Sequence, residues 1–130
     1  MSSKDSLKKV VAVSVVAGLW GASGFVHAIT GDLRSTDGGA RVVFNWAWVK
    51  TNSFSEPRLT GRVVLYDLKC DGSTPQFHIH LEKNGPVSSS HHNTLGCRKN
   101  RVIQLKTKFE ALQICNSGKH CYRWNPYDTP

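Results

Sequence analysis

Residues 76–83 (QFHIHLEK) show the clearest alternation of apolar and polar positions in this chain. Phe77, Ile79 and Leu81 fall on one face of an extended strand, because successive side chains of a strand point to opposite faces. Residues 101–108 alternate in the same way. Both segments are therefore expected to form half-buried β-strands.

Other apolar segments predict further strands. Residues 41–49 (RVVFNWAWV) carry apolar side chains on both faces, which is typical of a central, covered strand. Residues 62–69 end at an Asp-Gly turn, so they are expected to pair with residues 76–83 as a hairpin. Residues 109–115 are expected to extend the sheet, with a short helix as the alternative, and a weaker strand is expected within residues 87–96.

Polar, Gly-rich and Pro-containing stretches separate these strands. Residues 29–39 (ITGDLRSTDGG) predict a loose N-terminal lead, and residues 51–61 predict a loop. The aromatic and Pro-rich tail, residues 122–130, is expected to pack over one edge of the sheet. Short strands at this spacing, with no amphipathic helix between them, predict an all-β fold: a small antiparallel β-sandwich or open barrel of about five to seven strands stapled by two disulfides.

The first 28 residues have the pattern of a secretory signal peptide. Three lysines precede an uncharged run, residues 10–19, and Val26-His27-Ala28 supplies a small-x-small cleavage site. The uncharged run is shorter than the roughly 20 residues that cross a bilayer, and the glycines after it oppose the alternative of a retained anchor or core helix. We expect a secreted, extracellular protein with residues 29–130 as a single domain and no transmembrane segment after cleavage.

All four cysteines lie beyond that cleavage site, at Cys70, Cys97, Cys115 and Cys121. An even number of cysteines in a small exported chain predicts two disulfides. Three pairings are available, and we favour Cys70–Cys97 with Cys115–Cys121 because each closes a local loop without crossing the other. A zinc site is the alternative, but the chain has no C-x-x-C pair.

The chain is basic. It carries 17 Lys and Arg against nine Asp and Glu, and residues 29–130 keep 14 and eight of these, a formal net charge of +6. A basic exported domain attracts anionic surfaces such as wall polymers, acidic glycans or nucleic acid, although dispersed charge also serves solubility alone. Arg98, Lys99 and Arg101 form the densest cluster and are candidate ligand-binding residues.

Aromatic residues offer a second candidate surface. Trp and Tyr join a flat apolar face to a polar edge, which suits stacking on sugar rings. The candidates are Trp46, Trp48 and Trp124, together with Tyr66 and Tyr127, and core packing is the alternative role. The expected partner is therefore extracellular and unidentified: an anionic polymer, a glycan or a protein, with nucleic acid left open.

Histidines form the third candidate site. His78 and His80 lie two apart on one strand, so they project from the same face about 7 Å apart and suit a divalent metal. His91 and His92 follow in a polar segment that would supply a further ligand. The alternative is a set of ordinary surface histidines, because no acidic or cysteine ligand stands at a diagnostic spacing from them.

Two functions are alternatives to that of a binding domain: a nuclease and a protease inhibitor. His78, His80 and Glu82 share one face, and with Arg62 and Arg98 they have the residue types of a small secreted nuclease: a base, an acid and an Arg. Residues 115–121 form a short loop that would suit a protease inhibitor. No Gly-rich phosphate loop, Ser/His/Asp order signature, zinc-protease helix or EF-hand loop is present, so we predict no cofactor and favour a non-enzymatic exported binding or structural domain over an enzyme.

Three segments resemble a group of small exported proteins from filamentous Gram-positive bacteria. They are LYDLKCDG at residues 65–72, NTLGC at residues 93–97, and the Cys-x5-Cys that closes at residue 121. The resemblance implies a fold and an extracellular location, and no activity, since the group has none assigned. This chain departs from the group by placing cysteines at positions 70 and 97, where small residues are expected; that is consistent with the two positions being close in space.

We predict that export cuts the chain between Ala28 and Ile29. The basic start, uncharged run and Val-His-Ala ending supply the three parts that signal peptidase requires. N-terminal sequencing of the protein from culture medium should begin at Ile-Thr-Gly-Asp. Recovery of intact Met1 in a membrane fraction would contradict this.

Overall fold

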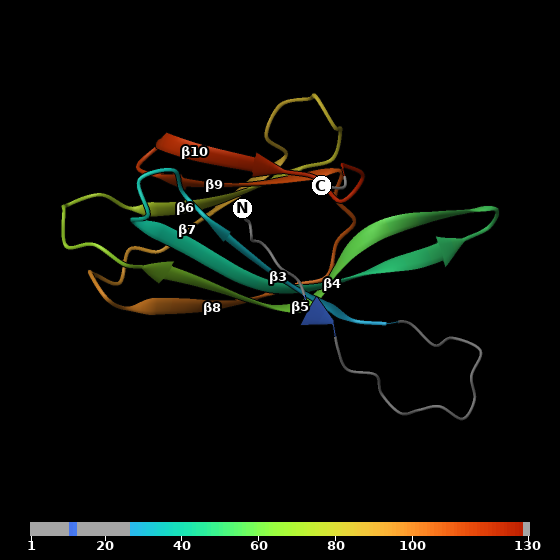
Figure 1. Cartoon of the computed structure of the whole chain (residues 1–130), viewed down its shortest axis with the longest axis horizontal. Helices are drawn as coiled ribbons and strands as arrows, with labels where there is room; N and C mark the ends of the chain where they lie inside the picture. Colours follow the sequence, from blue (N-terminus) through green and yellow to red (C-terminus); the bar gives the residue numbers. More distant parts are fainter. Residues whose placement is uncertain (1–10, 13–26, 129–130) are drawn as a thin grey trace.

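The computed structural model describes residues 11–12 and 27–128. Most of the predicted signal peptide lies outside these residues. Within them, the structure contains strands and no helix, arranged as two antiparallel sheets (Figure 1). The five-stranded sheet has the order β2 (Val11–Ala12), β3 (Ile29–Arg34), β4 (Ala40–Thr51), β5 (Phe54–Asp67) and β8 (Asn100–Leu105). The four-stranded sheet has the order β10 (Lys119–Trp124), β9 (Ala111–Asn116), β6 (Pro75–His80) and β7 (Ser89–His92).

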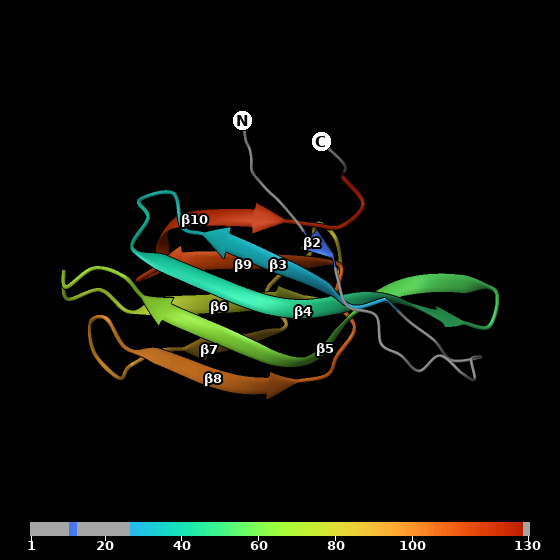
Figure 2. The same ribbon diagram turned by 60° about the horizontal axis from the view of Figure 1, so that its bottom comes forward.

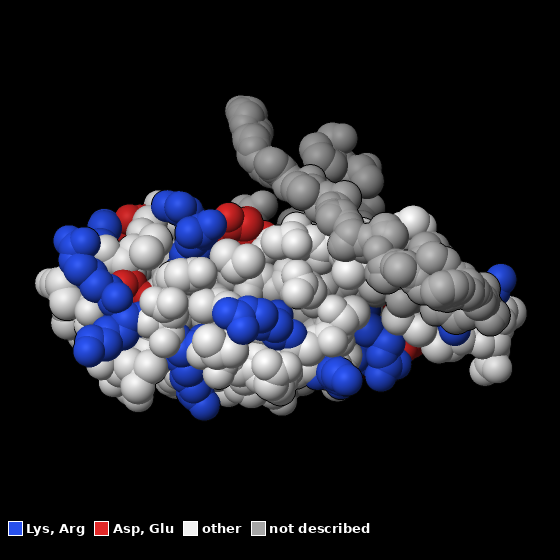
Figure 3. Space-filling view, turned by 90° about the horizontal axis from the view of Figure 1, so that it is seen from below, with Lys and Arg blue, Asp and Glu red and all other residues white. Residues whose placement is uncertain are grey.

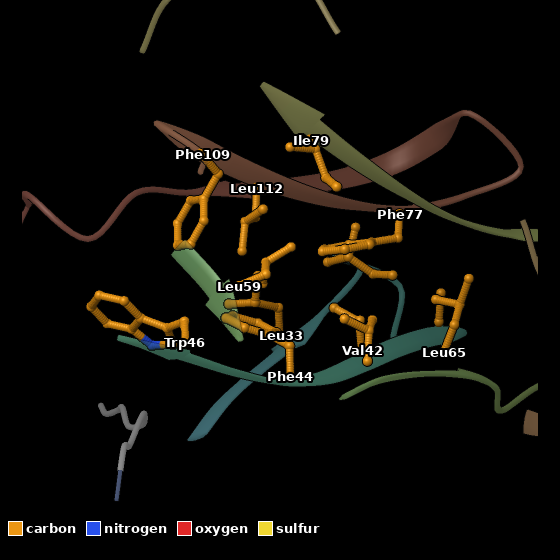
Figure 4. Packing of buried hydrophobic residues seen from close by; sticks show 13 residues of the cluster. Leu33, Val42, Phe44, Trp46, Leu59, Leu65, Phe77, Ile79, Phe109 and Leu112 are labelled. Atoms are coloured by element: carbon orange, nitrogen blue, oxygen red, sulfur yellow. The ribbon is translucent and has the colours of Figure 1, made fainter. Parts of the chain in front are cut away.

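The two sheets face each other across one hydrophobic core, as the side chains between the layers show (Figure 4). β4 and β5 contribute Val42, Phe44 and Leu65, and β6 contributes Phe77 from the opposite layer; all are at most 1% exposed. Burial of a side chain of this size stabilises the fold by about 1.5–3 kcal/mol. The expected all-β, two-disulfide fold is confirmed, although the described residues hold nine strands where five to seven were expected.

The first additional strand is β3, in the segment expected to be a loose lead. Its core face reads Ile29, Gly31, Leu33, and the middle residue has no side chain to complete the apolar pattern. The ring of Phe44 occupies that space, because a Cβ on Gly31 would lie 2.2 Å from the ring. The expectation of a loose lead was wrong. Gly31 interrupts the alternation of apolar side chains along β3, and the ring of Phe44 fills the space where an apolar side chain would lie.

A second correction concerns residues 51–61, which form a hairpin and not a loop. β4 turns at Asn52, whose φ of 52° is left-handed, and β5 begins at Phe54. Pro57 is tolerated inside β5 because its carbonyl accepts a hydrogen bond from Phe109, so its missing N–H faces that segment and costs no bond to β4. Figure 2 shows this hairpin extending beyond the two sheets.

A third correction concerns the expected hairpin between residues 62–69 and 76–83. β5 and β6 lie in different sheets; β5 pairs with β8, and β6 pairs with β7 and β9. The Asp-Gly segment between them is thus a crossing from one layer to the other. The expected strands in residues 87–96, 101–108 and 109–115 are confirmed as β7, β8 and β9.

Both predicted disulfides are confirmed, and the described residues hold no free cysteine. The Cα atoms are 4.8 Å apart in Cys70–Cys97 and 4.1 Å apart in Cys115–Cys121. Two disulfides indicate an oxidising environment. A search of the described part of the chain for a helix long and apolar enough to cross a membrane finds none.

Asn93 lies in the segment that leads from β7 back to β8, and its side chain binds that segment to the five-stranded sheet. Its replacement should lower the stability of the fold. Its side chain is 1% exposed, and its Nδ2 donates to the carbonyls of Leu65 and Lys99 at 2.9 and 2.7 Å. We expect Asn93→Ala to lower the free energy of unfolding by about 1–3 kcal/mol, because buried polar groups lose their partner. Urea denaturation of the oxidised protein measures this. Asn84→Ala, at an exposed position, is the matched control and should change stability by less than about 0.5 kcal/mol.

Candidate functional sites

The outer face of the four-stranded sheet carries a polar row that crosses all four strands. His78 on β6 stands opposite Ser90 on β7 and Gln113 on β9, and Arg123 on β10 stands opposite Gln113. His78 Nδ1 lies 2.7 Å from Ser90 Oγ. Sequence reasoning missed Ser90, Gln113 and Arg123, because only the strand pairing places them beside the histidine.

His80 shares that face with His78, as expected, but it is buried, with 2% of its surface exposed. Its Nδ1 lies 3.1 Å from the Gly85 carbonyl oxygen. Its Nε2 lies 3.0 Å from Gln113 Oε1 and 3.5 Å from Arg123 Nη1. Both ring nitrogens thus have partners within the protein, and His80 fastens the loop after β6 to β9.

The other two predicted metal ligands lie on opposite faces of β7, so only His92 shares the outer face with His78 and His80. His91 stands opposite Phe77 and lies on the core side of β7, whereas His92 stands opposite Gln76 on the outer side. Within the described residues, no three His, Cys, Asp or Glu side chains form a group that could hold a metal ion.

The residues of the nuclease hypothesis are also spread apart. Glu82 is exposed in the loop after β6, and Arg98 is exposed in the loop before β8. Arg62 stands opposite Gln104 in the other sheet, so it belongs to the far face of the molecule. The arginine nearest to the histidines is Arg123, whose side chain also donates to the Lys83 carbonyl.

The three candidate tryptophans divide between core and surface. Trp46 is 6% exposed, and its ring lies 5.5 Å from that of Trp124 and 6.0 Å from that of Phe109. Trp48 is 37% exposed and contacts the ring of Tyr127, with centroids 5.5 Å apart. The expected stacking platform therefore reduces to Trp48 with Tyr127, a residue of the tail.

Tyr127 sits in a partly dehydrated, acidic setting. Desolvation, together with its hydrogen bond to Glu110, raises the pKa of Tyr127 to about 12. The tail holding it is ordered by Asn125, whose Oδ1 accepts from the main-chain N–H groups of Tyr127 and Asp128. The expectation that the tail begins at residue 122 and packs over a sheet edge is corrected: residues 122–124 belong to β10, the outer strand of the four-stranded sheet, and Tyr127 beyond it contacts Trp48 on β4.

The predicted basic cluster does not act as one unit. Arg98 and Lys99 are exposed, whereas Arg101 Nη1 donates to the His92 carbonyl at 2.6 Å. Arg101 thus ties β8 of one sheet to β7 of the other.

The outer face of the five-stranded sheet carries several Lys and Arg side chains and few acidic ones, as Figure 3 shows. Strand register and alternation place six cationic residues on this side: Arg34, Arg41, Arg58, Arg62, Lys106 and Lys108. The acidic residues on the same side are Asp32 and Glu56, and each is already paired, with Arg41 at 2.7 Å and with Arg58 at 2.5 Å. This face therefore carries a formal charge of about +4, most of the +6 of residues 29–130.

A small hollow opens on that basic face at a β-bulge. The register between β4 and β5 shifts between Phe44 and Trp46, and the resulting hollow has a volume of about 100 Å³. Its lining includes Asn45 and Arg62 beside three apolar residues. No sequence pattern indicated the bulge.

Residues 115–121 form a tight hairpin. Ser117 and Gly118 both have positive φ, 57° and 73°, and Asn116 pairs with Lys119 across them. Two left-handed residues between paired strands are the geometry of a type I′ turn. Lys119, the cationic residue within the proposed inhibitor loop, is therefore already part of β10.

Comparison of the chain with family models, with curated proteins and with solved structures finds no match. The assignment of function depends on the faces described above.

Burial of two histidines should make stability depend on pH. Desolvation, and then neighbouring charges, lower the pKa of His78 and of His91 below 6.5. The unfolded chain therefore binds more protons, and the free energy of unfolding should fall as pH drops through about 6.5, until the lower folded pKa values are passed. Urea denaturation between pH 7.5 and 5 tests this. The double variant His78→Gln, His91→Gln should flatten the slope; an unchanged slope would contradict the assignment. His120→Gln controls for the loss of an exposed histidine.

Proposed function

We propose that this protein is an exported, non-enzymatic β-sandwich domain that binds an anionic polymer outside the cell. The observation that supports this is the concentration of charge on the outer face of the five-stranded sheet, where six cationic residues accompany two acidic residues that are already paired. Arg34 and Arg62 are exposed there.

The placement of these cations suits a polymer better than a single small anion. Neighbouring strands lie about 4.8 Å apart, and residues two apart on a strand about 7 Å, so the cations form a grid over an open surface. Arg34 and Arg62 lie two strands apart on that grid. A chain that bears repeated phosphate, sulfate or carboxylate groups can contact several of them at once, and long-range attraction raises its rate of association.

The hollow beside Arg62 gives that surface one preferred point of contact. An anionic group seated at its rim would meet a guanidinium, which offers paired N–H donors to planar or tetrahedral oxyanions. The neighbouring Arg41 is less available, because it forms two hydrogen bonds with Asp32, at 2.9 and 2.7 Å, and lies over the ring of Tyr66.

Several features support an extracellular setting for this function. The two disulfides suit an oxidising compartment, and β3, the first strand after the expected cleavage site, begins at Ile29. The resemblance to exported proteins of filamentous Gram-positive bacteria points the same way. In that setting, wall polymers and acidic glycans are the abundant polyanions.

The proposal predicts salt-sensitive retention on an immobilised polyanion such as dextran sulfate. Arg34→Gln and Arg62→Gln should each elute at lower salt than the parent protein, and the double variant at lower salt still, because each removes one contact of the grid. Lys119→Gln is the matched control, since it removes one positive charge from the turn of the other sheet.

Equal shifts in all three single variants would mean that net charge alone drives retention, and would refute a defined face. Absence of retention at low salt would direct attention to a neutral glycan or a protein partner.

A further inference from the structure

The free edge of the five-stranded sheet is β8, which pairs with β5 alone and has no strand beyond it among the described residues (Figure 2). The Leu59 N–H donates to the Thr107 carbonyl at 2.8 Å, and backbone groups alternate in direction along an antiparallel strand. Odd-numbered residues of β8 therefore direct their N–H and C=O groups toward β5. Those of Asn100, Val102 and Gln104 point to the open edge, where the described residues offer them no hydrogen-bond partner.

The side chains along this edge do not protect it. Edge strands are commonly shielded by an outward charge, a proline or a bulge. The outward row of β8 consists of Asn100, Val102 and Gln104, with no charge, and no proline or shift of register falls within the strand. Val102 is 49% exposed. The edge of β8 is thus a regular template with an apolar side chain at its centre.

The other three edges of the two sheets are less open. On β3, the strand β2 pairs with Ile29 and Thr30. On β10, the register shifts between Lys119 and Tyr122. β7 has four residues, and its His92 carbonyl already accepts from Arg101 of β8 at 2.6 Å. Among the described strands, β8 therefore offers the longest regular edge.

We propose that β8 pairs with β8 of a second copy of this chain, antiparallel about a two-fold axis at Val102. The outward row reads amide, apolar, amide, so it is the same in both directions. Val102 would stand opposite Val102 of the partner subunit, and Asn100 opposite the partner's Gln104. Each opposed pair would exchange two backbone hydrogen bonds, because these residues direct both groups to the edge.

Self-pairing in this register is favourable on both faces of the sheet. On the outer face, two exposed valines cover each other and the amide side chains meet as hydrogen-bonding pairs, with no like charges opposed along the row. On the core face, Ile103 is only partly buried against the core. It would stand opposite the partner's Arg101, whose aliphatic stem can cover it. The symmetric row thus favours a second copy over an unrelated strand.

This dimer would enlarge the basic face. A two-fold axis between antiparallel strands runs perpendicular to the sheet, so the outer faces of both copies lie on the same side. Arg62 stands opposite Gln104, one strand from the seam, so the cations of the two copies would form one continuous surface. The inference does not rest on polyanion binding, because the ladder forms without a ligand.

Sedimentation velocity of the oxidised protein, without polymer, tests the proposal. In about 0.15 M NaCl, which screens repulsion between the basic copies, the mass should rise from monomer to dimer with concentration. We expect a Kd of about 1–100 µM, because a single strand pair buries less than an interface of standard size. A protein that is monomeric throughout a range of about 5–500 µM overturns the proposal.

Two variants of Val102 locate the axis. Val102→Asp and Val102→Lys should each be monomeric over the same range, because each places two like charges opposite one another at the axis. An equal mixture of the two variants should recover a dimer, since the acidic variant then meets the basic one. The exposure of Val102 lets the monomer tolerate both changes, and an unchanged midpoint in urea verifies this.

Two further variants serve as controls. Val87→Lys replaces another exposed valine, 44% exposed in the loop between β6 and β7, and should keep the dimer. Arg34→Gln should also keep the dimer while it lowers retention on the polyanion, so that failure of one proposal is separate from failure of the other. The β8 dimer is refuted if either Val102 variant still dimerises alone, if their mixture stays monomeric, or if Val87→Lys abolishes association as they do.

Discussion

The packing of one ring, that of Phe44, links both layers of this protein. It fills the space over Gly31 on β3, lies 6.3 Å from the ring of Phe77 on β6, and lies 5.8 Å from that of Trp124 on β10. Through Trp124 the ring contacts continue outward to Trp46 and Trp48. A side chain of this volume at the centre of a close-packed core fixes the separation of the sheets and the position of the strands that contact it.

The packing of side chains into the core determines which residues face outward. In a strand whose alternate residues fill the core, the remaining residues must face outward. On β5 the inward set includes Val63 and Leu65, so Arg62 and Tyr66 face out. The basic face is thus a by-product of register: a shift by one residue would bury its arginines, and the core contacts forbid that shift.

The sequence predicted those features that depend on local pattern. Alternation identified β6 and β8, and the apolar run on both faces identified β4. The preference for short disulfide loops that do not cross identified both disulfides. The prediction from sequence failed where a strand depends on a contact with a residue distant in the chain. On β3, Gly31 interrupts the apolar pattern, and the ring of Phe44 supplies the missing volume. On β5, Pro57 suggested a break in the strand, because the sequence does not show that Phe109 donates a hydrogen bond to its carbonyl.

The candidate sites show the same division between local and distant information. The same-face relation of His78 and His80 follows from strand spacing alone. The burial of His80 depends on Gly85, Gln113 and Arg123, which come from three other segments, and no pattern near residue 80 reveals them. The position of β8 at an open edge likewise requires the crossing of the chain between layers, where the sequence had suggested a simple hairpin.

The Cys70–Cys97 disulfide also changes how the chain can reach this fold. Tyr66 on β5 pairs with Asn100 on β8, although 34 positions separate them along the chain. The disulfide closes most of that interval, spanning 27 positions and enclosing β6 and β7. Once it has formed, β5 and β8 are joined by a short path, as the two arms of a hairpin are. The entropy of closing a long loop is then already spent when the strands meet. Oxidation thus lowers the effective contact order of the five-stranded sheet, and the speed at which that sheet assembles depends on whether the bond precedes folding or follows it.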